Sequence, residues 1–146
     1  MNTIKKLFLV VALAFVAVGV KAQDKLVQFG DLPKVAQNFI TTYYAVNQVS
    51  YIKMEKELFS KSYDVKLNNG VEIEFDSKGN WTEVDAKKKA VPYQIVNPKI
   101  VAYVKKSFPN NEIVQISLDG RKIEVELTNG LELVFNKQGK FIGIEH

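Results

Sequence analysis

The chain has 146 residues, no cysteine and a formal net charge of +4, from 20 basic and 16 acidic residues. The missing cysteines exclude disulfides and thiol chemistry. Because three of the basic residues and none of the acidic ones lie in residues 1–22, the rest of the chain carries only +1, and without a basic patch interleaved with aromatic residues it is not expected to bind nucleic acid.

Residues 1–22 have the organisation of a cleaved secretory signal peptide. Two lysines precede an apolar run over residues 7–20, and Ala22 ends a Val-Lys-Ala cleavage signature. The run is too short for a transmembrane helix, which needs about 20 apolar residues. No cysteine follows it, so a lipid anchor at this site is excluded. We expect cleavage between Ala22 and Gln23, and a periplasmic or secreted protein without a membrane span.

A first helix is predicted after a short arm, residues 23–30, which could add an edge strand to a sheet. Asp31 can cap this helix, and Pro33 lies in the first turn, where its missing N–H is tolerated. The apolar stripe that predicts the helix comprises Leu32, Val35, Ala36, Phe39, Ile40 and Tyr43. A strand is predicted over about residues 49–59.

Two segments of alternating apolar and polar residues resemble each other at an offset of 60 residues. Residues 63–75 and 123–135 each read as two strands joined by Asn-Gly, which tolerates the positive φ angles of a tight hairpin. Gly79 and Gly139 then mark a second turn before a last short strand in each segment. The paired identities are Val65 and Val125, Leu67 and Leu127, Asn69 and Asn129, Gly70 and Gly130, Glu72 and Glu132, and Phe75 and Phe135.

A second helix is predicted from Pro98 to Phe108, capped by Asn97, and a strand follows over residues 113–118. The sequence thus favours an α+β fold of two tandem repeats, each a helix followed by a four-stranded antiparallel sheet, with the helices packed on one sheet face. The expected organisation is one domain over residues 23–146. Its parts are repeat one (about 31–85), a linker (86–96) whose lysine triplet is solvated, and repeat two (about 97–146).

The pattern of Leu-Pro before an aromatic helix, followed by Asn-Gly-Val-Glu-Ile-Glu-Phe-Asp-x-x-Gly-x-Trp, resembles the PepSY-like family of exported bacterial proteins. That family shares the fold of the β-lactamase inhibitory protein. The resemblance covers residues 29–146, with Phe141, Asn136 and Val134 as mild departures in the second copy. It implies a periplasmic or secreted binding module that could restrain a peptidase or another enzyme, and it supplies no catalytic residues.

Catalytic, metal and cofactor sites are not predicted. The only histidine is His146, the last residue, which is too poorly held to act as a base. A single histidine and scattered carboxylates do not provide the clustered ligands of a metal site. No glycine-rich turn precedes a helix whose N-terminus could bind phosphate. The acidic pair Glu72 and Glu74 alternates with apolar residues, as expected on a solvated sheet face, where Lys66 and Arg121 could pair with the acids.

The same polar sheet face is the predicted binding surface for a protein or peptide. If the neighbouring residues Thr82, Val84, Ile142 and Ile144 pack inward, Trp81 and Phe141 face outward among carboxylates, as aromatic anchors in a polar surround. The alternative is that the rings pack inward, because a bulge at Gly79 or Gly139 would flip the final strand that follows it. The predicted binding residues are Tyr51, Glu72, Glu74, Trp81, Glu132, Val134 and Phe141.

The sequence therefore favours an exported, non-enzymatic binding module. Two alternatives stay open, a carrier or sensor of a small envelope ligand held between helices and sheet, and a hydrolytic enzyme. A carrier requires an enclosed apolar cavity, and an enzyme requires a concave site with convergent titratable groups.

Overall fold

The computed structural model describes residues 24–145, so the expected signal peptide and its cleavage site lie outside the described residues. Two α-helices, α2 (Lys34–Tyr43) and α3 (Pro98–Ser107), accompany nine strands in this part of the chain. The strands are β1 (Lys25–Val27), β2 (Val49–Lys56), β3 (Lys61–Leu67), β4 (Glu72–Phe75), β5 (Trp81–Asp85), β6 (Ile113–Leu118), β7 (Lys122–Leu127), β8 (Glu132–Asn136) and β9 (Phe141–Glu145). None of the helices over residues 24–145 is long and apolar enough to cross a bilayer.

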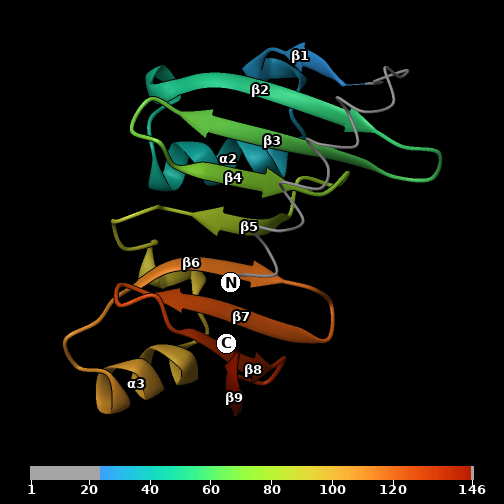
Figure 1. The fold of residues 1–146 in the computed structure, drawn as a ribbon. Helices are drawn as coiled ribbons and strands as arrows, with labels where there is room; N and C mark the ends of the chain where they lie inside the picture. Colours follow the sequence, from blue (N-terminus) through green and yellow to red (C-terminus); the bar gives the residue numbers. More distant parts are fainter. Residues whose placement is uncertain (1–23, 146) are drawn as a thin grey trace, which may run out of the picture.

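All nine strands form one antiparallel sheet in the order β1 to β9 (Figure 1). The expected fold of two tandem repeats, each with its own four-stranded sheet, is therefore wrong. The sheet continues because β5 pairs with β6, with Glu83 opposite Ser117 and Val84 opposite Ile116. Two separate sheets would each leave an edge strand with unpaired N–H and C=O groups, and this pairing satisfies them.

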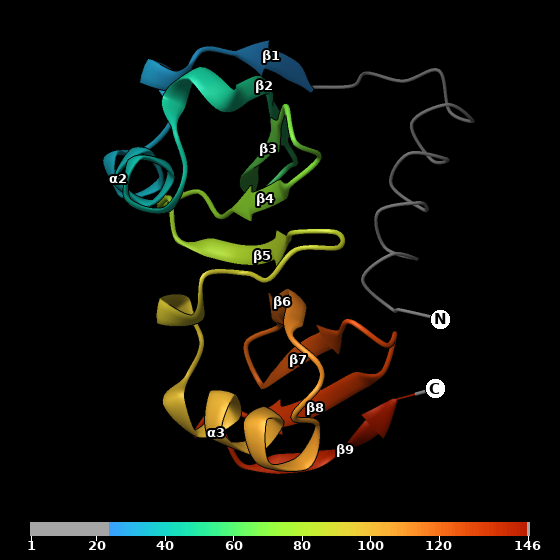
Figure 2. The same cartoon turned by 90° about the vertical axis from the view of Figure 1, so that its left-hand side faces the viewer.

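Both helices lie on the same side of the sheet (Figure 2). Asn97 caps α3 as predicted, because its Oδ1 accepts a hydrogen bond of 2.9 Å from the backbone N–H of Lys99. Asp31 does not cap α2. Its carboxylate accepts from the backbone N–H of Gln28 instead and closes the 3₁₀ turn that precedes the helix.

The core lies between the helices and the face of the sheet that they cover. Strand register places an apolar side chain on this face from every central strand, and Phe75 and Phe135 are fully buried in it. Ile40 of α2 and Ile100 of α3 are also fully buried. The apolar row that crosses the sheet comprises Ile52, Val65, Ile73, Val84, Ile116, Val125 and Leu133.

The local turn and edge predictions are confirmed. Gly70 and Gly130 have φ angles of 93° and 87° in the two Asn-Gly hairpins. The arm over residues 23–30 supplies β1, which pairs with β2 at the edge of the sheet. Phe29 packs against the core from the same arm.

Candidate functional site: the outer face of the sheet

The face of the sheet opposite α2 and α3, here called the outer face, is lined by polar side chains in two rows that cross the strands. Residues in a row are directly opposite one another in neighbouring strands. The first row is Tyr51, Lys66, Glu72, Asp85, Gln115, Glu126, Glu132 and Glu145. The second row is Lys53, Asp64, Glu74, Glu83, Ser117, Glu124, Val134 and Gly143.

Five of the seven predicted binding residues belong to these rows. Tyr51 and Glu72 flank Lys66 in the β2–β4 part of the first row, and Glu74 lies on β4 in the second row. Glu132 and Val134 lie on β8, toward the other edge of the sheet. Tyr51 is 46 % exposed, whereas Glu132 and Val134 are each only 6 % exposed. Among these five residues, Tyr51 is therefore the aromatic side chain that is accessible to a partner on the outer face.

Trp81 and Phe141 face the helices, so their expected outward orientation is wrong. A bulge directly after each ring is the physical reason, because Phe75 stands opposite Trp81 and Phe135 opposite Phe141, while Thr82 and Ile142 are skipped in the pairing. Phe141 stacks on Tyr103 of α3 with ring centroids 4.5 Å apart. Trp81 lies 6.5 Å from the ring of Phe39 on α2.

Lysines pair with part of the acidic set. Lys66 Nζ lies 2.6 Å from Glu72 Oε1, which confirms the predicted pairing of these two residues. Lys122 Nζ lies 2.9 Å from Glu124, and no ion pair to the expected partner Arg121 is found among the described residues. Lys87 was expected to be a solvated linker residue, yet its Nζ lies 3.1 Å from Glu72 and 3.0 Å from Asp85.

Three consecutive residues of the second row are acidic. Glu74 on β4 is directly opposite Asp64 on β3 and Glu83 on β5. Burial, followed by the negative charges of Glu55 and Glu74, raises the pKa of Asp64 to about 7. Burial also raises the pKa of Glu83 to about 8, against a hydrogen bond of 2.5 Å from Gln115, and the nearby charge of Glu74 acts in the same direction. Like charges placed opposite each other in a sheet are unfavourable. The one lysine of this row is Lys53 at its β2 end, with Nζ 3.7 Å from Asp64 and 2.6 Å from Glu55.

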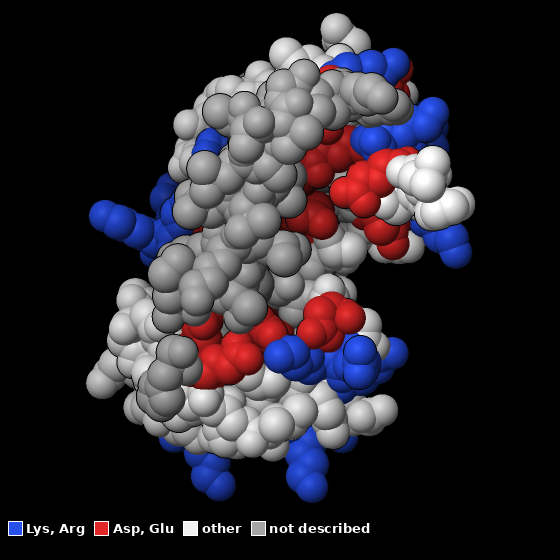
Figure 3. Space-filling view, turned by 45° about the vertical axis from the view of Figure 1, so that its right-hand side comes forward, with Lys and Arg blue, Asp and Glu red and all other residues white. Residues whose placement is uncertain are grey.

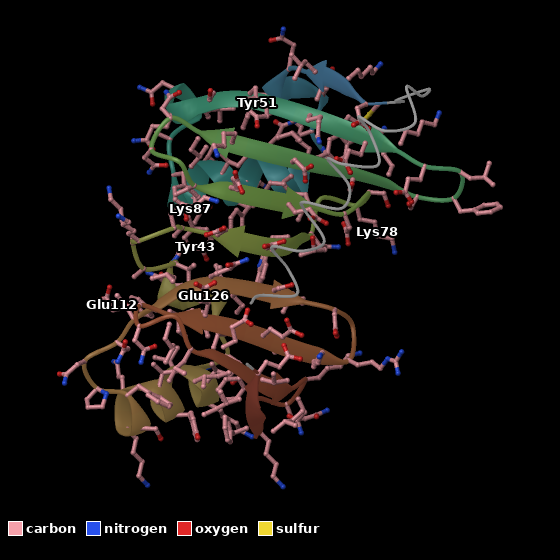
Figure 4. All side chains as sticks on the ribbon, in the orientation of Figure 1. Tyr43, Tyr51, Lys78, Lys87, Glu112 and Glu126 are labelled. Atoms are coloured by element: carbon pink, nitrogen blue, oxygen red, sulfur yellow. The ribbon has the colours of Figure 1, made fainter. Side chains whose placement is uncertain are left out.

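A hollow of about 70 Å³ lies between the two rows at their β2–β5 end. The ring of Tyr51 forms part of its wall, and Figure 4 shows this residue on β2 and Lys87 beyond β4. Figure 3 shows acidic side chains gathered over both halves of the sheet, with basic side chains beside them. Lining side chains on the outer face are Tyr51, Lys53, Asp64, Lys66, Glu72, Glu74 and Glu83. Glu72 and Asp64 have lysine partners, whereas Glu74 and Glu83 have none among the described residues. An aromatic ring beside these two carboxylates suits a cationic group.

The sequence hypothesis missed Asp64, Glu83 and Asp85 as members of this surface. Asp64 could have been found, because it lies between Tyr63 and Val65 in the strand alternation that located Glu72. Glu83 and Asp85 could not, because the bulge on β5 breaks that alternation.

Other kinds of site have less support in the described residues. Across residues 24–145 no group of three or more His, Cys, Asp or Glu side chains is arranged to hold a metal ion. Two surface grooves lie on the helix side. One of about 390 Å³ is lined by Phe39, Tyr43 and Trp81, and another of about 280 Å³ lies between Tyr93 and Val101.

Comparison with known proteins agrees with this architecture. Residues 61–143 match the family described as "putative beta-lactamase-inhibitor-like, PepSY-like". A "putative periplasmic protein from DUF2874 family" from Bacteroides vulgatus is 43 % identical, with a TM-score of 0.80, over 85 % of this chain and 98 % of that one. A "putative calcium-regulated periplasmic protein" from Bacteroides thetaiotaomicron is 38 % identical, also with a TM-score of 0.80, over 84 % and 97 %. No curated protein matches the chain.

The matched family model and the similar solved structures therefore place this fold in the β-lactamase-inhibitor-like, PepSY-like class. The chain belongs to the PepSY-like family, which confirms the resemblance drawn from its Asn-Gly hairpin motif.

Proposed function

We propose that the chain is a non-enzymatic periplasmic binding protein that recognises a basic segment of a protein or peptide partner with the outer face of its sheet. The observation that carries this proposal is the row of Asp64, Glu74 and Glu83, which are opposite one another on three adjacent strands. The periplasmic location rests on the descriptions of the similar proteins.

The charge pattern supports a cationic partner in particular. Glu74 accepts a hydrogen bond of 3.2 Å from the hydroxyl of Thr82, and Glu83 accepts one from Gln115, but neither carboxylate has a lysine or arginine within 4.0 Å among the described residues. A lysine or arginine of the partner would supply the missing counter-charge. Its aliphatic stem or its cation would contact the exposed ring of Tyr51.

The family description supports a regulatory role for such binding. A protein of the β-lactamase-inhibitor-like class that covers a basic surface of a peptidase or another envelope enzyme would restrain that enzyme without any chemistry of its own. A carrier of a small envelope ligand is the runner-up, with the aromatic-lined groove of 390 Å³ as its candidate site, but this groove is open at the surface and is not the enclosed cavity that a carrier requires. The acidic outer face favours the protein-binding proposal, because a carrier of an apolar ligand has no use for it.

Calcium regulation belongs to the description of the Bacteroides thetaiotaomicron protein and concerns that protein. We propose no calcium site here, because the acidic side chains of residues 24–145 do not converge on a common point.

Removal of two outer-face charges is the expected way to abolish partner binding. Wild-type protein and the double variant Glu74→Gln/Glu83→Gln, used as bait in envelope extract, should differ in recovered partner by roughly tenfold or more, since loss of a paired interface charge typically weakens binding strongly. Recovery by the wild type should increase from about pH 6 to about pH 8, because Asp64 and Glu83 ionise over this range. High salt should release the partner.

The matched control removes two carboxylates that lie outside both rows, in Asp31→Asn/Glu112→Gln. This variant should recover the partner as well as the wild type does. Equal recovery by the outer-face double variant, or a partner without a basic surface, would contradict the proposal.

A further inference from the structure

The turn between β2 and β3 exposes two large apolar side chains that contact no core. Leu58 is 86 % exposed and Phe59 is 95 % exposed. The turn itself is closed by polar groups, because the backbone N–H of Glu57 donates to the carbonyl of Ser60 at 2.9 Å. Folding therefore does not require apolar residues at the tip, since polar side chains would form the same hydrogen bond.

The other hairpin turns of the described chain show what this protein uses where only a turn is needed. Each of the five contains a glycine with positive φ, and each has an asparagine or aspartate before that glycine, as tight turns favour. These glycines are Gly70, Gly79, Gly120, Gly130 and Gly139. Among these hairpins only the β2–β3 turn has Leu-Phe in place of a glycine with an asparagine or aspartate, which indicates a separate role for the tip.

Two lysines, here called the collar, flank the apolar tip at the end of the β2–β3 ladder. Lys56 and Lys61 are opposite each other in the last β2–β3 pair, although like charges in this position are unfavourable. Both are exposed, and the Nζ of Lys61 lies 5.4 Å from the centroid of the Tyr63 ring. β4 pairs only with Tyr63 to Lys66 of β3, so the hairpin extends past its neighbour (Figure 1).

We propose that this hairpin tip is an interfacial anchor that inserts Leu58 and Phe59 into an anionic phospholipid bilayer. Each lysine of the collar is two residues from the apolar pair, which is about 7 Å along a strand. That separation fits the depth of about 5–10 Å to which interfacial segments bury their apolar side chains, with cations at the phosphate level. Lys78, in the β4–β5 turn, lies at the same end of the molecule (Figure 4) and adds a third cation.

The layering of the tip favours a lipid surface over an apolar pocket of a protein. In a bilayer, apolar groups lie deeper than cations. The hairpin has the same order, with Leu58 and Phe59 at its tip and the two lysines behind them. Glu57 is the one acidic residue of the turn, and its carboxylate accepts from the Ser60 hydroxyl at 3.4 Å. The anchor is independent of partner binding, because it lies in a turn outside the two rows of the outer face.

Vesicle flotation tests this inference on the processed protein, purified from the periplasm and verified by intact mass to lack residues 1–22. The wild type should float with vesicles of phosphatidylglycerol and phosphatidylethanolamine in equal parts and much less with phosphatidylcholine vesicles. Leu58→Ser/Phe59→Ser should lower the bound-to-free ratio by roughly tenfold or more, because two exposed apolar side chains lose their burial in lipid. Lys56→Gln/Lys61→Gln should remove most of the preference for anionic vesicles.

The matched control is Tyr93→Ser, which removes another exposed aromatic side chain, 69 % exposed, from a different surface. It should float like the wild type, and all variants should keep the wild-type melting temperature. The inference is overturned if the wild type stays unbound with anionic vesicles, as it would if the tip served only a protein pocket. It is equally overturned if the tip variant floats as well as the wild type.

Discussion

Gly79→Ala is expected to destabilise the protein by about 3 kcal/mol or more, against about 1 kcal/mol for Gly130→Ala. Both glycines have nearly the same positive φ, 88° and 87°, so both variants share the strain of a left-handed backbone. The two positions differ in the space available for a new Cβ atom. A Cβ at position 79 would lie 2.7 Å from the Cβ of Pro33 and 2.9 Å from the backbone N of Ala36, whereas nothing lies within 4 Å at position 130.

Urea unfolding of both variants measures this difference directly. The backbone of α2 cannot move away from a new methyl group without loosening the core around Ala36, which is fully buried. Gly130→Ala therefore serves as the matched control for the φ strain alone. Equal losses of unfolding free energy in the two variants would contradict the close packing of the β4–β5 turn under the start of α2.

Trp81→Ala/Phe141→Ala is the second variant with a large expected effect, a loss of roughly 3–5 kcal/mol in unfolding free energy. Phe141 stacks on Tyr103 and also contacts Phe135 edge-on at 5.7 Å. Its removal leaves space beside a fully buried ring. The orientation expected from sequence predicts the opposite, a variant that folds almost normally.

Tyr51→Ala is the control for this double variant, because Tyr51 lies on the outer face and is 46 % exposed. Its unfolding free energy should change by less than about 1 kcal/mol, as is usual for surface positions. A double variant that unfolds at the same urea concentration as Tyr51→Ala would show that the two rings do not support the core.

The sequence predicts local structure well where one face of a strand is buried. Alternation around Val65 and Val125, with Asn-Gly between apolar runs, correctly located both hairpins and the polar orientation of Glu72 and Glu74. These predictions succeed because alternation and turn residues are local properties.

Two features could not be predicted because they depend on contacts between distant segments. The β5–β6 pairing joins residues that are more than thirty positions apart, as in Glu83 and Ser117, and no local signal marks it. The bulges directly after Trp81 and Phe141 were left as an alternative by the sequence, and they arise where aromatic side chains gain burial against α2 and α3. The acidic row across Asp64, Glu74 and Glu83 depends on both strand register and the bulge, so only part of the candidate site was visible from sequence.

Site-directed photo-crosslinking in intact cells tests most directly whether the outer face binds a partner. Benzoylphenylalanine in place of Tyr51 should form a crosslink to a discrete partner, and the same group in place of Val35, 52 % exposed on α2, should not. Adding Glu74→Gln/Glu83→Gln should abolish the crosslink from position 51. Crosslinks that form from position 35 but not from position 51 would place partner binding on the helix side and contradict the central claim.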